Sequence, residues 1–207
     1  MTEPFRIAVL VSGSGTNLQA LLDTVHGAEV EIVAVAASRA GVRALERAER
    51  ADIETGVFPA GPGGAREARD EALGAWLSER DVQLVVLAGW MELLGPDFIG
   101  RFAGRIINVH PSLLPAFAGL QAIEQAVEYG VRVTGVTVHF VDSGIDTGAV
   151  ILQEALALSY PAPIADIEQR VHGIEHRLLP QAVRLIARGR VRPDPDNPRV
   201  VLIDDGD

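Results

Sequence analysis

The chain has 207 residues and a formal net charge of −10 at pH 7, and it contains neither lysine nor cysteine. The acidic balance argues against binding a nucleic-acid backbone. The two missing residue types exclude lysine Schiff-base chemistry, a P-loop lysine, disulfides and thiolate metal ligands. Residues 1–4 lack a signal-peptide pattern, and no apolar run reaches the ~18 residues of a membrane span. We therefore expect a cytoplasmic protein that binds neither nucleic acid nor a membrane.

The first half of the chain alternates apolar runs with amphipathic segments. Short apolar runs predict buried strands at residues 5–11, 30–37, 53–58, 83–88 and around Ile106. Helical spacing of apolar residues predicts helices at residues 18–22, 40–51 and 66–80. Strands that alternate with helices indicate βαβ units and a mainly parallel sheet.

The second half of the chain has a different pattern. Helices are predicted at residues 121–129 and 164–188, with two strands between them at 133–141 and 149–153 and a polar turn at 142–148. We expect one α/β domain over residues 1–207, with a Rossmann-like, mostly parallel twisted sheet, flanking helices and antiparallel strands in the C-terminal part. Its core covers about residues 5–189. Residues 190–207 form a tail with a short apolar run at 200–203 that suggests a loose edge strand, and we assign the tail no role.

Residues 12–17 (Ser-Gly-Ser-Gly-Thr-Asn) lie between the first predicted strand and the first predicted helix. Glycines at such a turn let the backbone approach a ligand, and the N–H groups of the helix start can bind an anion. The segment matches neither the dinucleotide fingerprint nor the P-loop. A plain tight turn capped by Ser, Thr or Asn explains it equally well.

Asn108 and His110 stand at the end of the strand around Ile106. Pro111 and Pro115 cannot continue a strand, so it ends around Val109. The carboxyl ends of strands are where open α/β sheets hold ligands, and residues at i and i+2 project to the same side. The amide can polarise a carbonyl while the imidazole handles a proton. For this pair alone, a capping Asn and a structural His remain an alternative.

Taken together, several segments resemble the folate-dependent formyltransferases, most closely those that act on glycinamide ribonucleotide. The resemblance runs from about Phe5 to Gly189. It rests on residues 108–115, 135–141 and 142–148, supported by 12–17, 87–91 and the Glu175-His176 pair. It implies that the amine of glycinamide ribonucleotide attacks the formyl carbon of 10-formyltetrahydrofolate, with no metal and no covalent enzyme intermediate.

The resemblance also implies residue roles. The catalytic residues would be Asn108, which meets charge on the formyl oxygen, His110, which stabilises that oxygen and moves protons, and Asp146, which orients the imidazole or a water. The substrate-binding residues would be Gly15, Thr16 and Asn17 at the phosphate, Glu175 at the ribose, and Met91 and Thr137 at the glycinamide. The folate-binding residues would be Arg66, Trp90, Met91, Leu93, Leu94, Val141, Asp142 and Asp146. His139 is interpreted as a core histidine satisfied by hydrogen bonding.

The chain departs from the family pattern at a few positions. Glu92 stands where the family usually has arginine, and Ala118 and Gln121 stand where it commonly has proline and histidine. These changes put substrate positioning in question more than the chemistry. Three other interpretations stay open: a 10-formyltetrahydrofolate hydrolase, a methionyl-tRNA or sugar formyltransferase, and a catalytically silent folate- or nucleotide-binding module. The protein could be a monomer or a homodimer.

Overall fold

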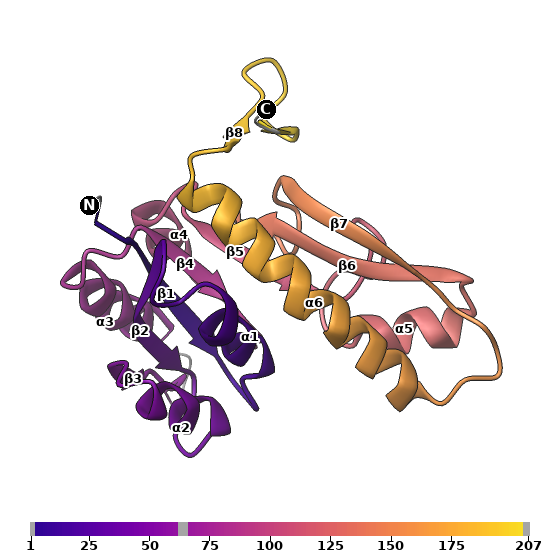
Figure 1. Ribbon diagram of the computed structural model, residues 1–207, viewed down its shortest axis with the longest axis horizontal. Helices are drawn as coiled ribbons and strands as arrows, with labels where there is room; N and C mark the ends of the chain where they lie inside the picture. Colours follow the sequence, from indigo (N-terminus) through magenta and orange to yellow (C-terminus); the bar gives the residue numbers. More distant parts are fainter. Residues whose placement is uncertain (1–2, 62–65, 205–207) are drawn as a thin grey trace. The chain divides into compact units, whose positions relative to one another are not determined.

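A parallel sheet organises the first half of the chain (Figure 1). The computed structural model describes residues 3–61 and 66–204, which group into a first unit, Met1–Ile107, and a second unit, Asn108–Asp207. The strands of the first unit are β1 (Phe5–Val11), β2 (Val30–Ala37), β3 (Thr55–Val57) and β4 (Leu84–Leu87). They lie in the order β3-β2-β1-β4, with parallel pairs throughout.

The helices of the first unit are α1 (Thr16–Thr24), α2 (Arg43–Arg50), α3 (Arg66–Ser78) and α4 (Pro96–Arg101). Helix α2 packs against β2 and β3, α1 against α2, and α3 against α4. Residues 7–11 of β1 and all of β4 are buried, as expected for parallel strands covered on both faces. Burial of each large aliphatic side chain here contributes roughly 1.5–3 kcal/mol.

Strand β5 (Ile106–His110) begins in the first unit, where Val85 N donates to Arg105 O at 2.9 Å beside β4. In the second unit the strand order is β5-β6-β7, and β6 (Val133–Phe140) pairs antiparallel with β7 (Val150–Ala157). Helix α5 (Ala122–Tyr129) packs against α6 (Ile164–Ala187), which lies along β6 and β7 (Figure 1). Strands β8 (Val191–Pro193) and β9 (Val201–Ile203) form a separate antiparallel pair.

The predicted α/β class, with a mostly parallel sheet and antiparallel C-terminal strands, is confirmed. Three local differences stand out. Helix α4 was not predicted, although Pro96 occupies the first helical turn, where its missing N–H costs nothing. Strand β7 runs on to Ala157. The apolar run at 200–203 pairs with β8 and does not form an edge of the main sheet.

The prediction of one domain over residues 1–207 stays a prediction, and residues 205–207 of the predicted tail lie outside the described part of the chain. No helix within residues 3–61 and 66–204 is both long enough and apolar enough to cross a bilayer.

Candidate active site

His110 ends β5, and the loop that follows fixes its ring. Pro111 has no N–H to continue the strand, so the chain turns away into residues 111–121. His110 Nε2 lies 2.9 Å from Phe117 O in this loop. Because a carbonyl oxygen can only accept, Nε2 carries the proton, and Nδ1 is the nitrogen left for chemistry. The ring is buried, so this single backbone contact sets its orientation.

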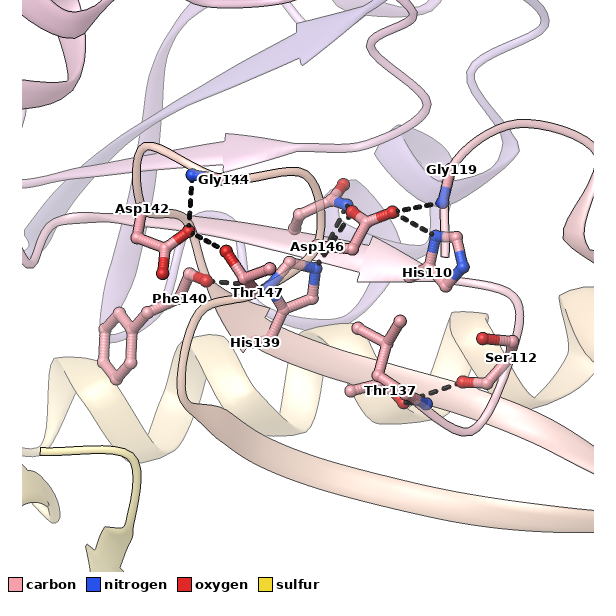
Figure 2. Close-up of polar contacts among 12 residues, drawn as sticks. His110, Ser112, Gly119, Thr137, His139, Phe140, Asp142, Gly144, Asp146 and Thr147 are labelled. Atoms are coloured by element: carbon pink, nitrogen blue, oxygen red, sulfur yellow. Dashed lines mark hydrogen bonds and ion pairs between the residues drawn. The ribbon is translucent and has the colours of Figure 1, made fainter. Parts of the chain in front are cut away.

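Asp146 joins this loop to the turn after β6 (Figure 2). Its φ of 52° is left-handed, a conformation that Asp adopts more readily than most residues. Asp146 Oδ2 accepts a hydrogen bond from Gly119 N at 2.8 Å and lies 3.4 Å from His110 Nδ1. The carboxylate therefore contacts the one ring nitrogen of His110 that the backbone does not hold.

Asn108 completes the predicted trio. Its Nδ2 donates to Asp146 Oδ1 at 3.4 Å and lies 3.3 Å from His139 Nε2. Both distances exceed the usual 2.7–3.2 Å, so these are weak contacts that a better acceptor can displace. The structure thus brings Asn108, His110 and Asp146 together inside the second unit.

His139 was not predicted as part of this group. It is buried, as expected, and its Nδ1 donates to Phe140 O at 2.7 Å, but its Nε2 also lies 3.6 Å from Asp146 Oδ1 (Figure 2). The alternation along residues 133–141 places His139 on the same strand face as Thr137, a predicted site residue. That shared face was the signal that could have identified it. Across the described residues, no group of three or more His, Asp or Glu side chains is arranged to hold a metal ion.

The environment of Asp146 sets its charge. Burial by itself would raise the pKa of this carboxyl, but hydrogen bonds from His139 and from Gly119 N–H, with the charge of His110, outweigh burial and lower it. The lowered pKa keeps Asp146 ionised at neutral pH. It is therefore suited to accept hydrogen bonds and to receive a proton briefly, and not to act as a resting acid.

Thr137 supports the loop that carries His110. It is 0% exposed. Its hydroxyl accepts from Leu114 N at 3.1 Å and Gln153 Nε2 at 2.9 Å, and donates to Ser112 O at 2.7 Å. Its one hydrogen and both of its lone pairs are engaged, and two of the three hydrogen bonds go to this loop, which includes the cis Leu114-Pro115 bond. The contact of Thr137 with substrate stays a prediction.

Residues 142–148 form a turn with a defined shape. Asp142 Oδ1 accepts from Gly144 N at 3.0 Å and from Thr147 Oγ1 at 2.6 Å (Figure 2). A Cβ added to Gly148 would lie 1.8 Å from Phe140 O, so only glycine fits there. These contacts hold Asp146 at its place in the turn, while the predicted folate contacts of Val141 and Asp142 stay predictions.

The glycine-rich turn of the first unit has the predicted form. Gly15 is the N-cap of α1 with a φ of 71°, and a Cβ there would lie 2.7 Å from Ala44 Cβ. Within the described part of the chain, no side chain caps α1 at Gly15, and its first turn has no acidic residue. A helix N-terminus of this kind suits an anion. Phosphate binding by Gly15, Thr16 and Asn17 stays a prediction.

The predicted folate residues of the first unit lie on and near the irregular segment 90–95. Met91 and Leu93 are 64% and 60% exposed, Leu94 is half-buried and Trp90 is buried. Arg66 begins α3, and its Nε would lie 3.7 Å from a Cβ built on Gly95. The contacts of these residues with folate stay predictions.

Glu175 is buried in α6 and faces two histidines. His172 Nδ1 lies 2.9 Å from Glu175 Oε2, and the rings of His172 and His176 stack at 6.3 Å between centroids. The hydrogen bond to Glu175 raises the pKa of His172 against the opposing effect of burial, whereas burial lowers the pKa of His176. Contact between Glu175 and a ribose stays a prediction.

Comparison with known proteins decides the family. The model of the family described as "Formyl transferase" matches residues 5–183. The chain belongs to the formyl transferase family. This confirms the resemblance recognised in segments 108–115, 135–141 and 142–148.

Three relatives show how far the family similarity extends. A phosphoribosylglycinamide formyltransferase of Haemophilus influenzae is 39% identical over 90% of this chain and 89% of its own length. The crystal structure of glycinamide ribonucleotide transformylase 1 from Symbiobacterium toebii superimposes with a TM-score of 0.90 and 43% identity, covering 98% of this chain and 95% of that one. A formyltetrahydrofolate deformylase from Pseudomonas syringae also gives 0.90, at 25% identity, covering 99% of this chain and 67% of that one.

The chain spans only part of the length of some of its relatives. It covers between 14% and 19% of the length of the trifunctional purine biosynthetic proteins that it matches at 42–43% identity.

Proposed function

We propose that this protein transfers the formyl group of 10-formyltetrahydrofolate to the amine of glycinamide ribonucleotide, as a step of de novo purine biosynthesis in the cytoplasm. One observation carries the proposal: Asn108 Nδ2 and His110 Nδ1 each lie 3.4 Å from an oxygen of one ionised carboxylate, that of Asp146. Membership of the formyl transferase family supports it, and so do the names of relatives that match this chain over nearly their full length.

The first step is attack of the substrate amine on the formyl carbon. A C–N bond forms, and negative charge develops on the formyl oxygen. The Asn108 amide donates to that oxygen, exchanging its long contacts with Asp146 and His139 for a shorter bond. A donor of this kind is typically worth about 3–4 kcal/mol of transition-state stabilisation.

The second step moves one proton and breaks one bond. The attacking amine must lose a proton, and N10 of the folate must gain one as its bond to the formyl carbon breaks. The His110 Nδ1 lone pair and the ionised Asp146 carboxylate, 3.4 Å apart, are the two acceptors for this relay. Either group takes the amine proton, directly or through a water, and the protonated group then donates it to N10. Assistance of this type contributes roughly 10²–10⁴ in rate.

Binding residues are proposed within each unit separately, each from its own surroundings. The uncapped N-terminus of α1 supports phosphate binding, and the buried, hydrogen-bonded carboxylate of Glu175 supports ribose recognition. The exposed apolar side chains of segment 90–95 support a pterin site. The proposed binding residues are Gly15, Thr16, Asn17, Met91, Thr137 and Glu175 for the ribonucleotide, and Arg66, Trp90, Met91, Leu93, Leu94, Val141, Asp142 and Asp146 for the folate.

The test is an absorbance assay of 10-formyl-5,8-dideazafolate mixed with the protein, with and without glycinamide ribonucleotide. We expect deformylation only when the ribonucleotide is present. Equal rates without it would make the protein a hydrolase, the activity named for the Pseudomonas syringae structure. No turnover in either mixture would leave a silent folate- or nucleotide-binding module. Asn108→Ala is the matched negative control, because it removes the proposed oxyanion donor.

A further inference from the structure

A buried cation lies in α3, outside the residues that the proposed reaction uses. The Arg69 side chain is 3% exposed. A buried guanidinium is costly unless charged and polar partners surround it. Its Nε and Nη2 donate to Asp70 Oδ1 at 2.9 and 2.7 Å, its Nη2 also donates to Leu93 O, and its Nη1 lies 3.4 Å from Glu92 Oε2. The Trp90 ring lies below it, with 5.8 Å from Cζ to the ring centroid.

These partners have one thing in common. Apart from Asp70, they all belong to segment 90–95. Asp70 itself reaches the same segment, because its Oδ2 accepts from Gly95 N at 2.6 Å. The segment has no strand or helix structure of its own. Its backbone is held by the side chains of Arg69 and Asp70 at one end and by Ser12 Oγ, which accepts from Met91 N at 2.9 Å, at the other.

The arrangement also accounts for Glu92. In the structure the Glu92 carboxylate pairs with Arg69, so it serves the segment's own conformation. Arg69, being enclosed by two carboxylates and a carbonyl, has no surface left for a ligand anion.

We propose that Arg69 is a positioning residue for folate binding, fixing the backbone of segment 90–95 through Leu93 O, Glu92 and the Asp70–Gly95 hydrogen bond. This inference rests on the proposed function, since it takes segment 90–95 as part of the folate site. The ionic contacts of Arg69 lie within the first unit, and none of them involves Asn108, His110 or Asp146. Loss of Arg69 therefore acts on folate affinity and not on the chemical step.

The test separates the two substrates. In Arg69→Met, which keeps most of the unbranched aliphatic stem and removes the donors, we expect two quantities to rise roughly tenfold or more, because charged hydrogen bonds that fix the segment are lost. They are the KM for the folate and the Kd of 10-formyl-5,8-dideazafolate measured by calorimetry. The KM for glycinamide ribonucleotide should rise less than the KM for the folate, because Met91, the one residue of the segment proposed for both substrates, is held by Ser12 at the other end. The kcat at saturating concentrations of both substrates should stay within about twofold. Arg101→Met is the matched control, because Arg101 pairs with Glu71 between α4 and α3 and, among the described residues, its side chain makes no hydrogen bond or ion pair to segment 90–95. This variant should leave the KM of both substrates unchanged.

Arg69→Lys keeps the positive charge, and it provides the test of the positioning role if Arg69→Met does not fold. One ammonium cannot reach Asp70, Glu92 and Leu93 O in the same geometry, so the folate Kd should still rise severalfold. An unchanged folate Kd in a folded Arg69 variant would overturn the inference, and so would a fall in kcat with both KM values unchanged. Failure of the proposed function is a separate result, because there the wild-type protein itself gives no formyl transfer.

Discussion

At Asp146, one carboxylate contacts four neighbours. Oδ2 meets Gly119 N and His110 Nδ1, while Oδ1 meets Asn108 Nδ2 and His139 Nε2. The charge therefore orders two loops and two imidazoles at once. Because these groups act as a unit, their individual contributions will not add.

Asp146→Asn should separate charge from shape. Asparagine tolerates the left-handed φ of 52° and is similar in size, so the turn should persist. Formyl transfer should fall roughly 10²–10⁴-fold because the proton acceptor is lost. The absorbance assay measures the rate, and circular dichroism checks the fold. Glu71→Gln, an exposed carboxylate of α3, is the control; a transfer rate within fivefold of wild type in Asp146→Asn would refute the role of the charge.

At the scale of the secondary-structure elements, β6 supports the loop that carries His110. Thr137 uses its hydroxyl on Ser112 O, Leu114 N and Gln153 Nε2. The neighbouring Thr134, also buried on β6, has a hydroxyl oxygen without a hydrogen-bond partner among the described residues. The two threonines lie on the same strand and are both buried. The hydroxyl of Thr137 makes three hydrogen bonds, whereas that of Thr134 makes none among the described residues.

This contrast gives a paired prediction. Thr137→Val should lower the free energy of unfolding by about 1–3 kcal/mol, because three polar groups lose a partner. It should also lower kcat, since the loop that holds His110 loosens. Thr134→Val should be neutral or stabilising, because it replaces an unsatisfied hydroxyl with a methyl group. Urea unfolding of both variants measures the difference, and equal destabilisation would contradict it.

The same elements show what the sequence can and cannot predict. Apolar runs located β1, β2 and β4, the alternation of apolar and polar residues located β6, and the prolines after His110 placed it at a strand end. The partners of Asp146 could not be derived in this way. Asn108 and Gly119 lie 38 and 27 residues before it, and His139 precedes it by one turn whose shape the sequence pattern does not give. These contacts also depend on strand register, where a one-residue slip reverses every face. The Arg69–Glu92 pair, 23 residues apart, was hidden for the same reason.

At the scale of the whole molecule, stability should depend on pH through two groups whose pKa values are shifted in opposite directions. The lowered pKa of Asp146 adds stability above its ordinary value of about 3.9, and that contribution is lost as the pH falls through the lowered pKa. The raised pKa of His172 adds stability that is complete below about 6.5 and is lost as the pH rises through the raised value. The two groups together favour stability in mildly acidic solution.

His172→Gln should isolate the second contribution. The variant should lose more stability relative to wild type at pH 5.5 than at pH 9, because only the charged imidazole strengthens the bond to Glu175. The side chain is half-exposed, so the difference should stay below about 1 kcal/mol. Thermal unfolding at both pH values measures it, and a difference that is equal or larger at pH 9 would reverse the sign argued here.

Both imidazoles of the site are anchored to main-chain carbonyls, His110 to Phe117 O and His139 to Phe140 O. A carbonyl oxygen belongs to every residue type, so changing the side chain at position 117 or 140 leaves the acceptor in place. The orientation of each ring therefore does not depend on which side chain stands at the residue that accepts its hydrogen bond. A change of side chain at these two positions can therefore alter the surface of the site without removing the carbonyl that orients each ring.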